Sequence, residues 1–430
     1  MKDTIIAQCS PAGRGAVSII RMSGARAAEL LFGAFSSNKK PAHGLMRLGV
    51  ITAGGIRDKV MTCIFFAPDS YTGEDVAEIY CHGSQAIVER IISHFVRLGA
   101  RNAEGGEFTK RAFYNGKVSL DEAEAVCDLI SAESEAQINA AFEAVGGAAR
   151  TATSGIAAIV TDVLASIEAA IDYPEEDLER QTEAEAAAKL TETKTRLTAL
   201  TETFSDGSRL RTGVRVAIIG AANAGKSSLL NALLGYDRAI VNARAGTTRD
   251  TIEESYVYRG MLFTLIDTAG LRAASDEAEI EGVRRSGEEA KRAHLVLWLG
   301  DTADGFCPKP NGAKVVKVLN KSDLGIPGNI KADMVISALS GDGITALKDR
   351  IYEETNTAAG GKEMLTNARH YEAAVRALEF ISRALDDVSA PPDCFAVYLK
   401  NALVALDEIT GATATDEVIN RIFAKFCVGK

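Results

Sequence analysis

The sequence predicts a multidomain α/β and α chain. An α+β domain is followed by a helical domain in two pieces, and a doubly wound α/β domain is inserted between those pieces. The first observation behind this prediction is length, because 430 residues are too many for one ordinary domain. The second is a pattern that changes from mixed strands and helices to long helices, then to alternating buried strands and helices, and back to helices. We expect domain segments at 1–118, 119–206, 207–360 and 361–430, the second and fourth forming one helical domain.

The composition excludes several classes of protein. With 47% hydrophobic and 25% charged residues, it is typical of a soluble globular protein. We find no run of 18 or more apolar residues, and the start, MKDTIIAQCSPAGRG, lacks the apolar core of a signal peptide. Seven scattered cysteines without a CxxC pair argue against a disulfide framework or a zinc site. We expect a cytoplasmic protein with no membrane span.

Charge is unevenly distributed along the chain. Residues 1–118 contain 15 Lys and Arg against 10 Asp and Glu, a net charge of +5, whereas residues 119–206 contain 5 against 19, a net charge of −14. Two solvated surfaces of opposite sign explain this difference. A second explanation is that the first segment approaches an anionic partner such as RNA.

The first segment carries short runs rich in β-branched residues, separated by Gly, Pro and Asp, and two runs with apolar residues at helical spacing. The expected strands are DTIIAQ (3–8), GAVSIIRMS (15–23), LMRLGVITA (45–53), KVMTCIFFA (59–67) and DVAEIYCH (75–82), and the expected helices are ARAAELLFGAF (25–35) and SQAIVERIISHFVRLGA (84–100).

The later segments divide into helical and α/β patterns. Ala- and Glu-rich sequence with apolar residues at i, i+3 and i+4 predicts long amphipathic helices after residue 119 and again after residue 361. The run TDEVINRIFAKF predicts a packed final helix that Val428 and Gly429 end. Between these helices, apolar runs predict the buried strands of a parallel sheet: VRVAIIG (214–220), FTLIDTAG (263–270), LVLWLG (295–300), AKVVKVLN (313–320) and DMVIS (333–337).

A phosphate-binding motif lies between the first of these strands and the helix SSLLNALLG. The segment GAANAGKSS (220–228) matches G-x-x-x-x-G-K-[ST] in the strand–loop–helix context that the motif requires. Its backbone N–H groups would surround phosphates, Lys226 would contact the β- and γ-phosphates, and Ser227 would bind Mg²⁺. The alternative, an ordinary glycine-rich turn, does not account for this placement.

Four further segments follow in the order of a guanine-nucleotide switch protein. AGTTRD (245–250) offers Thr248 to Mg²⁺ and the γ-phosphate, and DTAG (267–270) places Asp267 behind the metal and Gly270 beside the γ-phosphate. NKSD (320–323) offers Asp323 to the N1–H and amine of guanine, which adenine cannot match, and SAL (337–339) offers a backbone N–H to guanine O6. Together the five segments predict GTP, rather than ATP, as the substrate.

The residue that would orient the attacking water is less easily predicted. Leu271 follows DTAG, where Ras-like GTPases carry a glutamine, and its side chain cannot orient water. The oxygen of Asn223 could hold a monovalent cation that neutralises transition-state charge, or Asn223 could simply brace the loop. A carboxylate from DEAEIEG (276–282) could then orient water.

Besides the nucleotide motifs, the chain carries the distinctive stretches DTIIAQCSPAGRGAVSIIRMSG, SYTGEDVAEIYCHGS, GGEFTKRAFYNGKVSLDEAEAV, LDEITGATATDEVINRIFAKF and the terminal CVGK. With these stretches, nearly the whole chain resembles the MnmE (TrmE) family, GTPases of tRNA wobble-uridine modification. It departs from the family at HGS (82–84), where HGG is usual, at GGEF (105–108), at VNARAG (241–246) and in a short segment at 301–314. The VNARAG departure bears on the cation site, and the others leave the nucleotide motifs intact.

The resemblance implies a folate-binding N-terminal domain that mediates a homodimer. Arg21, Glu78, Lys117 and Lys430 match the positions that contact the one-carbon donor, a 5-formyl- or 5,10-methylene-tetrahydrofolate. The resemblance also implies an FAD-bearing partner, MnmG (GidA). With it, such a protein installs an aminomethyl or carboxymethylaminomethyl group on C5 of the wobble uridine, U34, of certain tRNAs.

For the Ras-like GTPase domain, the resemblance implies activation by K⁺ and dimerisation across the nucleotides. Asn223, Asn242, Arg244 and Thr247 match the K⁺ positions, Ser227 and Thr248 would bind Mg²⁺, and Glu279 matches the glutamate that orients water. The residues expected to act in catalysis are Glu279, Asn223, Lys226 and Cys427. The expected GTP contacts are Asn223, Ala224, Gly225, Lys226, Ser227, Ser228, Asn242, Ala243, Arg244, Ala245, Gly246, Thr247, Thr248, Asp267, Thr268, Ala269, Gly270, Asn320, Lys321, Ser322, Asp323, Ser337, Ala338 and Leu339.

The terminal FCVGK places Cys427 where a prenylated protein carries its lipid-accepting thiol, but it ends in Lys and follows no polybasic segment. The resemblance directs this tail at the folate pocket, where Cys427 is either a nucleophile or a thiol in a tight pocket. Two other functional readings stay open. One is a GTP-controlled RNA-binding module without a folate-type domain, and the other is a folate-dependent one-carbon carrier that GTP only regulates.

Overall fold

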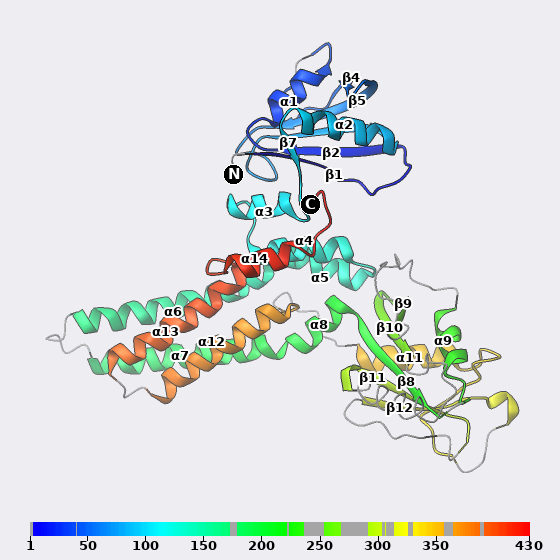
Figure 1. Cartoon of the computed structure of the whole chain (residues 1–430). Helices are drawn as coiled ribbons and strands as arrows, with labels where there is room; N and C mark the ends of the chain where they lie inside the picture. Colours follow the sequence, from blue (N-terminus) through cyan, green and yellow to red (C-terminus); the bar gives the residue numbers. More distant parts are fainter. Residues whose placement is uncertain are drawn as a thin grey trace, which may run out of the picture. The chain divides into compact units, whose positions relative to one another are not determined.

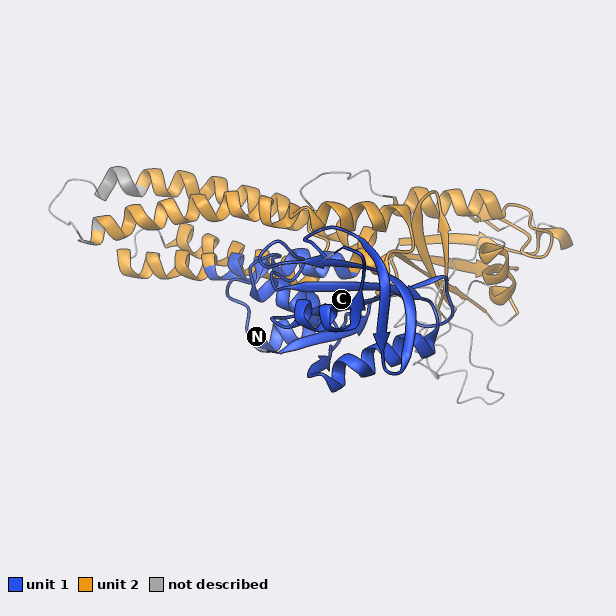
Figure 2. Cartoon of the chain, turned by 90° about the horizontal axis from the view of Figure 1, so that it is seen from above, with its two compact units in different colours: residues 1–127, 404–430 blue, residues 128–403 orange. Residues whose placement is uncertain are grey.

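The computed structural model describes residues 3–39, 41–172, 179–221, 223–235, 253–267, 291–302, 306, 314–325, 330–356, 364–387 and 391–430. The chain divides into two units, residues 1–127 with 404–430 and residues 128–403, which Figure 2 shows in different colours. The domain boundaries expected from the sequence, and the insertion of one domain into another, stay predictions.

The first unit is built on a seven-stranded sheet in the order β3-β4-β5-β6-β2-β1-β7 (Figure 1). Neighbouring strands are antiparallel except β1 and β7, which are parallel. The five longest strands are those that the sequence predicts. The bounds are β1 (Thr4–Gln8), β2 (Val17–Ser23), β3 (Phe35–Ser36), β4 (Arg47–Ala53), β5 (Ile56–Phe65), β6 (Val76–His82) and β7 (Ala100–Asn102).

Helices α1 (Ala27–Ala34) and α2 (Gln85–Arg97) pack on one face of this sheet, and both confirm sequence predictions (Figure 1). Their apolar side chains form a core with Ile20 and Met22 of β2 and with the inward-facing residues of β6. Arg21 alternates with Ile20 and Met22 and pairs with Glu78 across the strands. Because strand side chains alternate between faces, Arg21 and Glu78 lie on the face opposite α1 and α2.

A small helical cluster completes this unit. Leu120 and Ala123 of α4 (Leu120–Ser131) pack with Ile419 and Phe423 of α14 (Asp416–Phe423), and α3 (Glu107–Tyr114) also contacts α14. Helix α14 begins at an N-cap Thr415, which accepts a hydrogen bond from the backbone of Val418. The prediction that Val428 and Gly429 end this helix is wrong. The helix ends at Phe423, and the chain then turns so that Phe426 packs back into the cluster.

Apart from the helices that cover its sheet, the second unit contains α5 (Glu135–Val145), α6 (Ala148–Asp172), α7 (Glu179–Glu202), α8 (Phe204–Thr212) and α12 (Ala368–Asp386), together with α13 (Pro392–Thr410) as far as Leu403. Helix α7 packs against α6 and α12 (Figure 1). Lys400 of α13 forms an ion pair of 2.8 Å with Glu168 of α6. Among the described residues, Ala148–Ala169 is the one helical stretch apolar and long enough to cross a membrane, with a mean hydropathy of 1.4. This is weak support for a membrane span, because core helices of soluble proteins share these properties.

The second unit also contains a six-stranded sheet in the order β13-β12-β11-β8-β10-β9. Five strands are parallel and confirm the sequence prediction, whereas β9 pairs antiparallel with β10 and was not predicted. An antiparallel edge strand is common in such sheets. The bounds are β8 (Val214–Gly220), β9 (Glu253–Tyr258), β10 (Met261–Asp267), β11 (Leu295–Gly300), β12 (Lys314–Leu319) and β13 (Met334–Val335).

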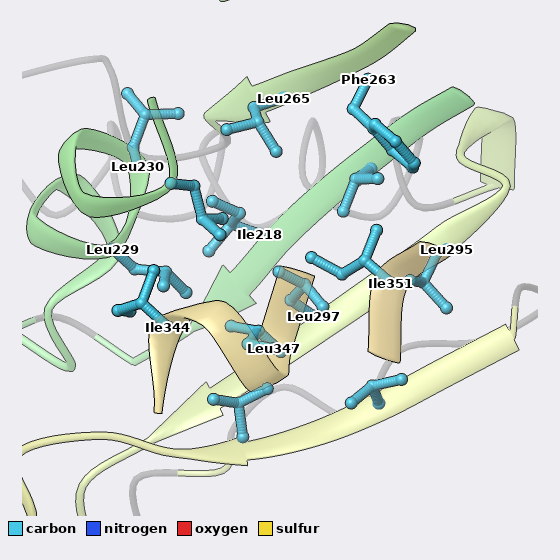
Figure 3. Close-up of a cluster of buried hydrophobic side chains, with 14 of the residues drawn as sticks. Ile218, Leu229, Leu230, Phe263, Leu265, Leu295, Leu297, Ile344, Leu347 and Ile351 are labelled. Atoms are coloured by element: carbon cyan, nitrogen blue, oxygen red, sulfur yellow. The ribbon is translucent and has the colours of Figure 1, made fainter. Parts of the chain in front are cut away.

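Both faces of this sheet are buried. Figure 3 shows Ile218, Leu265 and Leu297 of the sheet directed toward residues of α9 (Lys226–Leu234) and α11 (Ile344–Thr355). On the other face, Ala217, Ile219 and Val296 form a smaller buried cluster. The sheet is therefore the rigid support from which the loops at the carboxyl ends of β8, β11 and β12 project, the edge where parallel sheets bind ligands.

Candidate functional site

The phosphate-binding motif forms a loop between β8 and α9. Lys226, the first residue of α9, folds back so that its Nζ donates hydrogen bonds to the carbonyl oxygens of Gly220 and Ala221, at 2.8 and 2.7 Å. The N-cap Gly225 has φ +93°, a left-handed conformation that favours glycine. The loop thus places a lysine ammonium and a helix N-terminus at one point, which suits a phosphate group.

Asn320, at the end of β12, joins this loop to a second one. Its Nδ2 donates to the carbonyl oxygen of Ala224 at 2.9 Å, and its Oδ1 accepts from the backbone N–H of Ala338 at 3.0 Å. Asn320 is only 4% exposed, and a Cβ at Gly225 would lie 2.2 Å from its Nδ2. The side chain therefore fixes the spacing between the phosphate loop and Ser337–Leu339.

Asp323 lies on the short 3₁₀ turn η1 (Ser322–Leu324) beside the same loop. The buried Ser337 donates its Oγ hydrogen bond to Oδ1 of Asp323 at 2.6 Å, which fixes the direction of an otherwise exposed carboxylate. Lys321, with φ +62°, forms an ion pair of 2.6 Å with Asp301. These contacts hold an exposed carboxylate in one orientation, which suits recognition of two adjacent N–H groups.

The structure describes only some of the remaining residues that we expect to contact the nucleotide. Ser227 and Ser228 are exposed on the first turn of α9, and Asn223, with φ +62°, is exposed in the phosphate loop. Asp267 ends β10, but nothing further of its side chain is described. The other expected residues lie outside the part of the chain that the structure describes: Asn242, Ala243, Arg244, Ala245, Gly246, Thr247, Thr248, Thr268, Ala269, Gly270 and Glu279.

In the first unit, Arg21 and Glu78 form an ion pair. Nε and an Nη of Arg21 each lie 2.9 Å from Oε1 of Glu78, and Tyr80 donates its hydroxyl hydrogen to Oε2 at 2.6 Å. Burial, together with the bond to Glu78, raises the pKa of Tyr80 well above its usual value, so its hydroxyl remains a donor at neutral pH. The sheet register accounts for the pair, because Arg21 and Glu78 are cross-strand partners.

The chain's last residues reach the same unit beside α3. The backbone N–H of Gly106 donates to the carbonyl of Cys427 at 3.3 Å, and that of Phe108 donates to Lys430 O at 3.0 Å. Gly429 has φ +100°, and a Cβ there would lie 2.4 Å from the carbonyl oxygen of Gln8. Close approach to β1 therefore requires glycine at this position.

The four predicted folate residues are placed differently. Arg21 and Glu78 touch, and the backbone of Lys430 is held by Phe108, whose ring lies near Arg21. Lys117 is exposed and its stem lies beside Gly73. The side chain of Cys427 is exposed, so the described contacts do not place its thiol in a tight pocket.

Comparisons with known proteins agree along the whole chain. A family model described as the MnmE helical domain matches residues 120–427, and one described as the GTP-binding protein TrmE N-terminus matches residues 4–117. The tRNA modification GTPase MnmE of Akkermansia muciniphila is 40% identical over 444 aligned residues, which cover 99% of each chain. The protein of the same name from Caulobacter vibrioides is 38% identical and covers 100% of each.

The chain belongs to the MnmE family of tRNA modification GTPases.

This membership confirms two sequence predictions, the MnmE resemblance and the enzyme class of GTP hydrolase. Residues 4–117 match the TrmE N-terminus, and the folate-type character of this domain stays a prediction. Among solved structures, the FeoB G domain of Methanococcus jannaschii is 25% identical and covers 33% of this chain and 97% of its own, with a TM-score of 0.25. The α/β fold rests instead on the sheet order described above.

Sequence reasoning missed several residues of the MnmE N-terminal unit that surround Arg21. The rings of Tyr71 and Phe108 lie 5.4 and 5.7 Å from its guanidinium carbon, and Tyr80 bonds its partner Glu78. Cys9 also lies close: burial raises the pKa of its thiol, and the positive charge of Arg21 offsets this only in part. The motifs SYTGEDVAEIY and GGEFTKR contain the aromatic residues, but only the fold brings them together.

Proposed function

We propose that the chain is a potassium-activated GTPase that modifies C5 of the wobble uridine, U34, of certain tRNAs. With an FAD-dependent partner of the MnmG (GidA) kind, it installs an aminomethyl or carboxymethylaminomethyl group, using 5-formyl- or 5,10-methylene-tetrahydrofolate as the one-carbon donor. The observation that carries this proposal is the bridge made by Asn320, which joins the phosphate loop to the loop beside Asp323 in a chain of this family.

In the proposed GTP site, each described residue has a chemical task. Lys226 neutralises charge on the β- and γ-phosphates, and the backbone from Asn223 to Ser228 surrounds them. Asp323, oriented by Ser337, accepts hydrogen bonds from N1–H and the amine of guanine. GTP reacts with water to give GDP and phosphate, and Glu279 would orient that water.

Two cations are proposed for this site. The exposed hydroxyl of Ser227 on the first turn of α9 is a neutral oxygen of the kind that Mg²⁺ accepts, and Thr248 would supply a second. The exposed Asn223 lies in the phosphate loop, where its oxygen would hold K⁺ together with Asn242, Arg244 and Thr247. Positive charge at these positions stabilises the charge that develops during phosphoryl transfer.

The folate proposal rests on the contacts around Arg21. A folate has a pterin ring with N–H donors at one end and glutamate carboxylates at the other. Glu78 and Arg21 supply a carboxylate and a cation side by side, and Lys430 and Lys117 supply further positive charge. These residue types fit such a ligand. We also propose a cytoplasmic homodimer, formed through the N-terminal domain, that binds tRNA and the FAD protein and has no membrane association.

Reconstitution tests this function. The purified chain, the FAD protein, unmodified tRNA, GTP, K⁺, Mg²⁺ and the folate donor are combined with ammonium or glycine as the source of the amine and, for a 5-formyl donor, with a two-electron reductant such as NADH. The nucleosides are then analysed by mass spectrometry. We expect modified U34 only in the complete mixture, with loss of product when GTP or the folate is left out. Product formation without folate would contradict the proposed donor, and formation without GTP would contradict the role of hydrolysis.

A further inference from the structure

Arg21 lies beside two aromatic rings in addition to its ion-pair partner Glu78. Its side chain is 19% exposed, and its guanidinium carbon lies 5.4 Å from the ring centroid of Tyr71 and 5.7 Å from that of Phe108. Both distances fall within the range of cation–π attraction. Two rings from separate segments therefore flank the guanidinium of Arg21, which we propose contacts the folate ligand.

The ring of Tyr71 is itself fixed. Its hydroxyl shares a hydrogen bond of 2.8 Å with Thr109 of α3. The next residue, Thr72, is fully buried, and its hydroxyl lies 2.7 Å from that of Ser23. Asn115 donates to the carbonyl oxygen of Thr72 at 2.7 Å. The loop that carries Tyr71 is thus bonded to both β2 and α3.

Phe108 connects Arg21 to the chain's last residues. Its ring is fully buried beside Arg21, and its backbone N–H donates to Lys430 O at 3.0 Å. Val428 forms a β-bridge with Gly105, three residues before Phe108. One residue therefore contacts Arg21 through its ring and holds the tail through its main chain.

We propose that Tyr71 and Phe108 are positioning residues of the one-carbon-donor site, whose rings fix the guanidinium of Arg21, and that the main chain of Phe108 ties Lys430 to the same place. This inference rests on the proposed folate function. An arginine side chain that is already ordered loses less conformational freedom when it binds a ligand carboxylate. Fixing Arg21 and the tail before the ligand arrives therefore strengthens binding without any new contact to the ligand.

The first test measures the affinity of the full-length chain for 5-formyl-tetrahydrofolate by calorimetry. We expect Tyr71→Leu and Phe108→Leu each to weaken binding about tenfold. Tyr71→Phe keeps the ring and loses only the bond to Thr109, so it should stay within about threefold of wild type. The matched variant Thr109→Val, which removes the same bond from the other side, should behave like Tyr71→Phe. GTP turnover and the unfolding midpoint are recorded for every variant.

Two outcomes would overturn the proposal. One is an affinity of Tyr71→Leu within twofold of wild type. The other is an equal loss in Tyr71→Phe and Tyr71→Leu, because the ring would then have no role of its own. A purely structural role predicts that affinity falls in step with the unfolding midpoint, whereas positioning predicts that Tyr71→Leu loses affinity with little change in the midpoint.

The second test needs no folate. Phenylglyoxal modifies arginine, and mass spectrometry gives its rate at each site in the ligand-free chain. We expect Arg21 to react at least about fivefold faster in Tyr71→Leu than in wild type, while the exposed Arg57 of the same unit reacts at an unchanged rate. Equal rates at Arg21 would contradict the positioning role. If the wild-type chain binds no 5-formyl-tetrahydrofolate, the proposed donor is wrong, and the Arg21 rates still test the positioning role.

Discussion

Replacing Asn320 by Ala should weaken GTP binding about thirtyfold. The substitution removes two hydrogen bonds, to the carbonyl of Ala224 and from the N–H of Ala338. Each is worth about 1 kcal/mol net, so the loss is about 2 kcal/mol, and about 1.4 kcal/mol corresponds to a tenfold change in affinity. Because Asn320 joins the phosphate and guanine loops, we expect loss of affinity for both GTP and GDP.

Fluorescence titration with a methylanthraniloyl derivative of GTP measures this effect. Ser340→Ala is the matched control, because Ser340 lies in the same loop but is exposed, and among the described residues its hydrogen bonds go to its neighbours Asp342 and Ser337. We expect that control to stay within about twofold of wild type. If Asn320→Ala bound the nucleotide within threefold of wild type, with an unchanged unfolding midpoint, Asn320 would not couple the two loops.

Three other predictions concern Lys226, Asn223 and Arg111. Lys226→Ala should weaken GTP binding by roughly a hundredfold, because a charge-assisted contact to phosphate is lost; an unchanged Kd would contradict the phosphate assignment. GTP turnover should be faster in K⁺ than in Na⁺ at equal ionic strength, and Asn223→Ala should remove the difference, whereas equal wild-type rates would refute the cation role. Arg111→Met should destabilise the first unit by about 3–5 kcal/mol in urea unfolding at pH 7, because Arg111 is 1% exposed and paired with Asp3, Glu74 and Glu107. Burial alone raises the pKa of Glu107, but hydrogen bonds from Arg101, the Glu104 backbone and Arg111 together lower it below 4.5. The ionised carboxylate of Glu107 therefore stabilises the fold above about pH 4.5, and this stabilisation is lost as the pH falls through the pKa of Glu107 in the folded state. Between pH 5 and pH 3, the free energy of unfolding of the wild type should therefore fall by more than that of Arg111→Met.

The sequence predicts the parallel sheet and the helix that follows the phosphate-binding motif well because both depend on local patterns. The strand at Val214–Gly220 and the helix from Lys226 follow from apolar runs and from the motif between them. β9 was missed because ESYVY is short and half-buried, and antiparallel pairing with β10 stabilises it. Helix α3 was missed because its eight residues show little apolar periodicity, although α14 packs against it.

The tail and the surroundings of Arg21 could not be predicted from local pattern. Helical spacing continues beyond Phe423, but the fold ends α14 there because Phe426 packs with Leu120 and Phe423 in one cluster. Tyr71 and Phe108 come near Arg21 only when the loop before β6 and the start of α3 meet above β2. These are contacts between distant segments, which spacing along the chain does not encode.

The most direct test of the central claim is the modification state of U34 in cells of the source organism. The gene is deleted and then restored as wild type or as Lys226→Ala, and tRNA nucleosides are analysed by mass spectrometry. We predict that the C5 modification disappears on deletion, returns with the wild type and does not return with Lys226→Ala. Unchanged modification in the deletion strain, or full restoration by Lys226→Ala, would contradict a GTP-dependent role in wobble-uridine modification.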